Sequence, residues 1–146
     1  MLAALLALVG LFVAIYLTLF KIGVIGELAC AAGSCETVQT SRWAIFLGAP
    51  VAAWGIGYYA TVLAMAVAGT TERWENSPTL ATSMLVLTGW GALFSLWLTG
   101  LELFVIHAIC QWCVGSATIA IALFVVSLLD WREERLLRQD EAPITG

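Results

Sequence analysis

Two pairs of cysteines are the residues in this sequence best suited to chemistry. Cys110 and Cys113 form a C-x-x-C motif, and Cys30 and Cys35 are the only other cysteines. Residues three apart lie on one face of a helix, so a C-x-x-C at a helix start can close a disulfide. The free amides and positive dipole of a helix N-terminus favour the thiolate, which is the reactive form. Two such pairs in a membrane protein indicate an electron relay.

The same spacing leaves two other interpretations open. Zinc sites use cysteines with about two to four residues between them, and both pairs fit that range. Static disulfides are the other possibility. A metal adds little to a bundle already held in lipid, and a disulfide across adjacent helical turns constrains nothing. Redox chemistry is therefore favoured over a non-enzymatic membrane scaffold with a structural zinc or disulfide site.

The composition predicts a membrane protein. The chain has 146 residues, of which 62% are hydrophobic and 11% charged, and its mean hydropathy is +0.97. Soluble domains contain about 25% charged residues. The net charge is −4 and the charges are clustered, so no basic surface is expected to bind nucleic acid. The length suits one compact bundle.

Four apolar segments predict an all-α integral membrane protein with a four-transmembrane-helix bundle. A helix needs about 20 apolar residues to cross the bilayer, and in lipid it satisfies its own backbone hydrogen bonds. The first segment is expected to be a retained helix, because signal peptides have shorter apolar cores of about 7–15 residues. The predicted spans cover about residues 2–20, 50–69, 79–106 and 110–129.

The segments between the spans are more polar. Residues 21–49 contain glycines and charges, which predict a loop with one short helix that holds Cys30 and Cys35. Residues 70–78 predict a short turn. Residues 132–146 predict a tail that extends the last helix and then frays.

Basic residues set the expected orientation. With four spans, the two termini and the turn at 70–78 share one side of the membrane. That side holds Arg73, Arg132, Arg135 and Arg138, whereas the other side holds Lys21 and Arg42. The positive-inside rule therefore predicts cytoplasmic termini. Both cysteine pairs then face the oxidising, periplasmic side, although the spans were predicted without reference to the cysteines.

Other side chains near the C-x-x-C are expected to have ordinary roles. His107 is expected to be an interfacial residue that hydrogen-bonds a carbonyl. Glu102 is costly deep in lipid but ordinary near the outer edge of the membrane. The tryptophans are expected to include interfacial anchors: Trp43, Trp54, Trp90, Trp97 and Trp112.

Thiols outside a membrane need an acceptor for two electrons. The sequence has no haem-attachment motif, no Rossmann fingerprint and no iron–sulfur spacing. By elimination, the expected acceptor is a quinone dissolved in the bilayer, and no metal is expected.

Four parts of the sequence together resemble a bacterial member of the vitamin K epoxide reductase family. They are the Cys30 and Cys35 pair, residues 36–43 (ETVQTSRW), residues 46–50 (FLGAP), and residues 101–106 (LELFVI) leading to CQWC at 110–113. The resemblance covers nearly the whole chain from the first span to the fourth. Its specificity comes from the combination of loop pair, Ser-Arg-Trp and C-x-x-C.

The resemblance implies a bundle around a quinone of menaquinone, ubiquinone or vitamin K type. Cys110 and Cys113 would be the active-site pair, with Cys113 next to the quinone. Cys30 and Cys35 would be shuttle cysteines, with Cys35 the partner of Cys110, and Ser41 would help to position the site. Electrons would pass from a thioredoxin-like protein through the loop pair and the C-x-x-C to the quinone by thiol–disulfide exchange.

The sequence also differs from its relatives. Many bacterial members carry a fused thioredoxin-like domain, whereas this sequence ends soon after its fourth span, so the expected partner is a separate periplasmic DsbA-like protein. The expected location is the inner membrane. The second span lacks the Asn of the mammalian enzymes and Ala117 replaces their Tyr, which favours a plain quinone over an epoxide. DsbB-type proteins carry their C-x-x-C in the first outer loop, so the order here favours the vitamin K epoxide reductase family.

Overall fold

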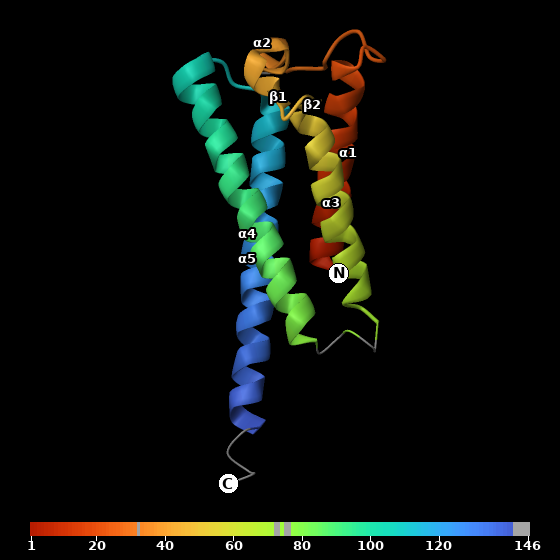
Figure 1. Cartoon of the computed structure of the whole chain (residues 1–146), viewed down its shortest axis with the longest axis vertical. Helices are drawn as coiled ribbons and strands as arrows, with labels where there is room; N and C mark the ends of the chain where they lie inside the picture. Colours follow the sequence, from red (N-terminus) through yellow and green to blue (C-terminus); the bar gives the residue numbers. More distant parts are fainter. Residues whose placement is uncertain (32, 72–73, 75–76, 142–146) are drawn as a thin grey trace.

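The computed structural model is an all-α bundle of four long helices, as the sequence predicts (Figure 1). It describes residues 1–31, 33–71, 74 and 77–141. Within these residues, four helical segments are long and apolar enough to cross a membrane. They are α1 (Leu2–Lys21), α3 (Val51–Ala68), α4 (Pro78–Leu101) continued by the π-helical η2 (Glu102–Ile106), and α5 (Gln111–Glu141).

Small residues allow the helices to pack closely. Helix α1 packs chiefly along α3, and α4 along α5. A Cβ added to Gly10 of α1 would overlap the Tyr59 ring of α3, and one added to Gly55 would lie 3.3 Å from the Ala14 Cβ. Without a hydrophobic driving force in lipid, such close approach supplies much of the helix association.

Residues 22–50, here named the cysteine loop, connect α1 to α3. They contain α2 (Cys35–Thr40), the 3-10 helix η1 (Arg42–Ala44), and the strands β1 (Ile45–Phe46) and β2 (Ala49–Pro50). The antiparallel hairpin was not predicted, because two-residue strands are too short to show an alternating pattern. Its turn residues Leu47 and Gly48 have φ values of 51° and 81°, and such a pair of positive values is typical of a type I′ turn.

Figure 1 shows how the four helices distribute the connections between two ends of the bundle. The cysteine loop and the α4–α5 connection lie at one end. The N-terminus, the α3–α4 connection and the C-terminal part of α5 lie at the other. The two cysteine pairs therefore share one end of the bundle.

Helix α5 continues into the predicted tail without a break and ends at Glu141. Several residues used in the sequence predictions lie outside the described residues: Ala32, Glu72, Arg73, Glu75 and the last five residues of the tail.

The α4–α5 connection begins at His107. Gly100 lies inside α4, and η2 extends the helical path to Ile106. His107 then adopts a left-handed conformation, with φ 54°, and ends the helical path. Left-handed geometry is tolerated by histidine several-fold more readily than by most residues.

Candidate active site

The C-x-x-C occupies the start of α5. Cys110 directly precedes the helix, and its carbonyl accepts a hydrogen bond from the Val114 amide at 3.0 Å. Cys113 lies in the first helical turn. Both thiols are free, Cys110 is fully buried and Cys113 is half-buried. A hydrogen bond from the Cys113 thiol lowers the pKa of Cys110 below that of a free cysteine, which favours its reactive thiolate.

Cys30 and Cys35 are joined by a disulfide. Cys35 begins α2 and is 1% exposed. It belongs to the same apolar cluster as Cys110, together with Leu17, Leu28 and Val38. The structure therefore brings the oxidised loop pair and the reduced C-x-x-C into one packed group.

A short backbone pairing joins the cysteine loop to the segment before α5. Gly33 forms an isolated antiparallel bridge with Cys110, and the Ser34 amide donates to the Ile109 carbonyl at 2.8 Å. Gly33 has φ +91°, and a Cβ at this position would overlap the Ile109 carbonyl oxygen. Only glycine fits both the dihedral angle and the close approach.

Gln111 and Trp112, the two residues between the cysteines of the C-x-x-C, also bind the cysteine loop through their side chains. The Trp112 indole donates to the Ala29 carbonyl at 2.8 Å. The Gln111 side chain accepts from the Ala31 amide at 3.1 Å and donates to the Ala29 carbonyl at 3.3 Å. The Trp112 ring also packs against Tyr16 of α1, with centroids 5.1 Å apart.

Two polar side chains near Cys113, Gln39 and Glu102, were not predicted from the sequence to belong to the site. The Gln39 amide nitrogen donates to the Cys113 sulfur at 3.4 Å, and Gln39 is 7% exposed. Glu102, expected to be ordinary at the membrane edge, is instead 4% exposed. Its carboxylate accepts a hydrogen bond from the Cys110 amide at 3.0 Å, and it interacts with the Cys113 thiol.

Both missed residues left a signal in the sequence. Gln39 follows Cys35 by four residues, so the two share one face of α2. Glu102 is an acidic residue in an otherwise apolar span, which is a functional signal by default. Neither signal identifies its partner, because Gln39 meets Cys113 across 74 positions of sequence.

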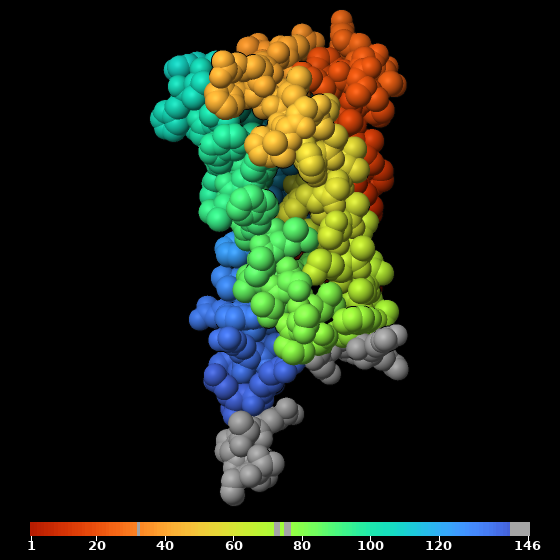
Figure 2. Space-filling view, viewed as in Figure 1, coloured from red at the N-terminus to blue at the C-terminus, as the bar shows by residue number. Residues whose placement is uncertain are grey.

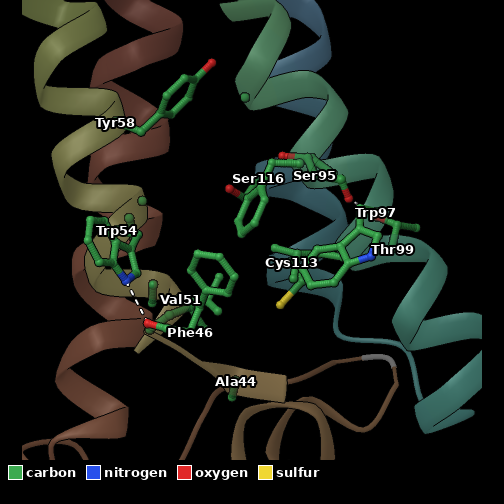
Figure 3. Close-up of a pocket in the computed structure, with 18 of the residues that line it drawn as sticks. Ala44, Phe46, Val51, Trp54, Tyr58, Ser95, Trp97, Thr99, Cys113 and Ser116 are labelled. Atoms are coloured by element: carbon green, nitrogen blue, oxygen red, sulfur yellow. Dashed lines mark hydrogen bonds between the residues drawn. The ribbon is translucent and has the colours of Figure 1, made fainter. Parts of the chain in front are cut away.

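Cys113 opens into a cavity of about 860 Å³. Figure 2 shows the surface hollowed between α3 and α4, beneath the cysteine loop. In Figure 3 the Cys113 sulfur points into this space, with Phe46 and Trp97 on its sides. The wall is mainly apolar and aromatic: Trp43, Phe46, Trp54, Tyr58, Trp90, Phe94 and Trp97, with Ala117 among the small residues.

The cavity wall also holds a few polar groups. The Tyr58 hydroxyl is buried and has no hydrogen-bond partner among the described residues. It lies against Gly91 of α4, where a Cβ would overlap it. The neighbouring Tyr59 hydroxyl is occupied, since it lies 2.8 Å from both the Ser116 carbonyl and the Ser116 hydroxyl. The Tyr58 hydroxyl is therefore a buried donor at the cavity wall that has no partner among the described residues.

The structure places the remaining predicted residues as follows. The Ser41 hydroxyl donates to the Val38 carbonyl at 2.7 Å, just after α2 ends, and Ser41 lines the cavity. His107 is exposed at the end of η2, and its predicted hydrogen bond to a carbonyl is not found among the described residues. Of the five tryptophans, Trp112 holds the loop and the other four line the cavity.

The zinc interpretation requires the four sulfurs to converge on one ion. Cys30 and Cys35 are instead bonded to each other. In the part of the chain that the structure describes, no three His, Cys, Asp or Glu side chains are grouped so that they could hold a metal ion.

The comparison with known families agrees with this geometry. A sequence profile of the vitamin K epoxide reductase family matches residues 1–128. The chain belongs to this family. It is a multi-pass membrane protein of the thiol oxidoreductase type.

Proposed function

We propose that this protein oxidises a thioredoxin-like protein and passes the electrons to a membrane quinone, in support of disulfide bond formation. The route runs through Cys30 and Cys35 and then through Cys110 and Cys113. The observation that best supports it is the position of the C-x-x-C. Cys110 is packed with Cys35 under the loop, and the Cys113 sulfur faces the apolar cavity.

The cavity suits a quinone ring. Its aromatic walls offer stacking surfaces, and the unpaired Tyr58 hydroxyl offers a donor to a carbonyl oxygen. The hollow between α3 and α4 opens on a side of the bundle that lipid would cover (Figure 2). A ligand dissolved in the bilayer would enter there without crossing the polar loop. When bound, the quinone accepts two electrons and two protons.

The transfers are three balanced exchanges. The dithiol of the partner reduces the Cys30–Cys35 disulfide and becomes a disulfide itself. The loop dithiol then reduces a Cys110–Cys113 disulfide through a mixed disulfide between Cys35 and Cys110. The two electrons of the reduced C-x-x-C pass to the quinone, and the Cys110–Cys113 disulfide forms again. The loop disulfide and free C-x-x-C of the structure correspond to the state before this last step.

The proposed location is the inner membrane, with the cysteine loop on the periplasmic side. Arg132, Arg135 and Arg138 lie on the extension of α5, at the end opposite the cysteines. An excess of basic residues at that end favours a cytoplasmic location for it. The cysteine pairs then meet the oxidising compartment in which disulfides persist.

An assay in detergent tests the proposal. Purified protein is given a soluble quinone and a reduced thioredoxin-like donor, and quinone loss is followed. We expect turnover in the wild type and a loss of about 10³-fold or more in Cys113→Ala, because the sulfur at the cavity is removed. Cys35→Ala should lose turnover with the protein donor and regain it with a small dithiol that reduces the C-x-x-C directly.

The same assay can reject the proposal. A wild-type protein that consumes no quinone with any donor, or a Cys113→Ala variant with full activity, would remove the relay. If metal analysis found stoichiometric bound zinc, the protein would instead be a membrane scaffold with a structural zinc site.

A further inference from the structure

The Glu102 carboxyl is buried against both residues of the C-x-x-C. Its carboxylate accepts a hydrogen bond from the Cys110 amide at 3.0 Å and interacts with the Cys113 thiol. Among the described residues, the titratable groups that interact with it are these two thiols, and the facing side chain from the cysteine loop, Gln39, is neutral. An ionisable residue is costly to bury in a membrane span, so it is a candidate for function when its partners are reactive.

An irregular backbone creates this contact. Glu102 begins the five-residue π-helical turn η2, and its carbonyl accepts the Ala108 amide at 3.1 Å. The chain then reverses at His107, which brings Cys110 back to the Glu102 side chain. Single π-helical turns are rare and are frequent at functional sites. A regular α-helix continuing from α4 would not return the chain to Glu102.

The proposed reaction moves protons as well as electrons. Two S–H bonds break, one S–S bond forms, and two electrons reach the quinone. The quinone must also take up two protons to become a quinol. Glu102 and Cys113 line the same cavity, and the rest of its wall is mainly apolar. A proton acceptor that touches both the thiol and the cavity is therefore needed at this point.

We propose that Glu102 carries the protons from the thiols to the quinone, an inference that rests on the proposed function. The carboxylate, which interacts with the Cys113 thiol at this buried site, takes its proton and leaves the thiolate that donates electrons. It then releases that proton into the cavity to the reduced acceptor. The second thiol proton follows the same route. Glu102 is a carboxylate again after each turnover, so protons and charge balance.

Glu102→Gln tests this role with little disturbance of the fold. The amide oxygen can still accept the Cys110 amide, but it cannot take up a proton. We expect kcat to fall by roughly 10²-fold, as for loss of a general base, and KM for the quinone to stay the same. Glu102→Asp keeps a carboxyl group and should recover part of kcat. The matched control is Glu36→Gln, the same change at an exposed position next to Cys35.

A second measurement does not depend on the quinone. The equilibrium of Cys110 and Cys113 with dithiothreitol mixtures gives their reduction potential at each pH. If Glu102 exchanges protons with the thiols, its ionisation is linked to their redox state, and the wild-type profile has an inflection that Glu102→Gln lacks. Glu36→Gln should keep the inflection.

The outcomes separate the two proposals. A Glu102→Gln variant with wild-type kcat, or with an unchanged pH profile of the potential, overturns the proton-carrier role. Should the wild type consume no quinone, the proposed function fails, and the potential measurement still decides whether Glu102 is linked to the thiols. Thermal unfolding of each variant shows whether a loss of kcat reflects a loss of fold, and partial recovery in Glu102→Asp argues against it.

Discussion

The C-x-x-C lies between the cysteine loop on one side and the cavity on the other, and these two regions contact it in different ways. On the loop side, a backbone bridge holds the cysteine loop in place, together with hydrogen bonds between the loop backbone and the side chains of Gln111 and Trp112. On the cavity side, the wall is built of aromatic rings and small residues, and the Tyr58 hydroxyl has no hydrogen-bond partner within the described part of the chain.

The difference follows from what each side must do. Disulfide exchange requires sulfurs to meet in a narrow geometry, so the loop is fixed by directional bonds. An acceptor from the bilayer must enter and leave, so the opposite wall is apolar and uses few directional bonds. Variants on the two sides should therefore change different kinetic constants.

The largest effect on this comparison is expected from Gly33→Ala. The new Cβ would overlap the Ile109 carbonyl at a positive φ, a strain of about 1–3 kcal/mol that would displace the loop. Turnover with a protein donor should fall by up to about 100-fold, and turnover with a small dithiol should be nearly unchanged. Gly26→Ala is the control, since nothing lies within 4 Å of its added Cβ. Equal losses with both donors would show that the two sides are not independent.

The ionisation of the Cys110 thiol with pH tests the contact between the two thiols independently of the loop and the cavity. Because the pKa of Cys110 is lowered, its thiolate should form at a lower pH than that of a free cysteine. The ultraviolet absorbance of the thiolate, measured with the loop disulfide intact, reports the midpoint of this ionisation. Cys113→Ala removes the hydrogen-bond donor and should move the midpoint to higher pH. A wild-type midpoint near that of free cysteine would contradict the assigned hydrogen bond.

On the cavity side, Gly91→Ala should raise KM for the quinone by about tenfold. The added methyl overlaps the Tyr58 ring and would push it into the cavity, a repacking that costs about 1–3 kcal/mol. Initial rates at varied quinone concentration measure the effect. Gly100→Ala on the same helix has no atom within 4 Å of its added Cβ and should behave as wild type. The apparent KM for the protein donor should not change in either variant.

The smallest effect is expected from Trp112→Phe. It removes one hydrogen bond to the Ala29 carbonyl, worth about 0.5–1.5 kcal/mol, and keeps an aromatic ring against Tyr16. Turnover with a protein donor should fall a few-fold. The matched control is Trp54→Phe, which loses an indole hydrogen bond of 3.0 Å to Phe46 at the cavity. If the two variants change the same constant, the proposed division between loop side and cavity side is wrong.

Several local features were predictable because they depend on near neighbours in sequence. The apolar segments predict four spans, and polar residues 21–49 predict a loop with a short helix. The hairpin and the π-helical turn escaped prediction, because each depends on a few dihedral angles, such as the positive φ values of Leu47 and His107.

The sequence by itself determined the membrane class, the helices and the position of the C-x-x-C at a helix start. These follow from hydropathy and from spacing within one or two helical turns. Only the tertiary structure decided what surrounds the sulfurs. Gln39 reaches Cys113, Gln111 reaches Ala31, and Glu102 folds back onto Cys110. Such contacts join residues on different elements, so they depend on how helices pack and turn, which no local periodicity encodes.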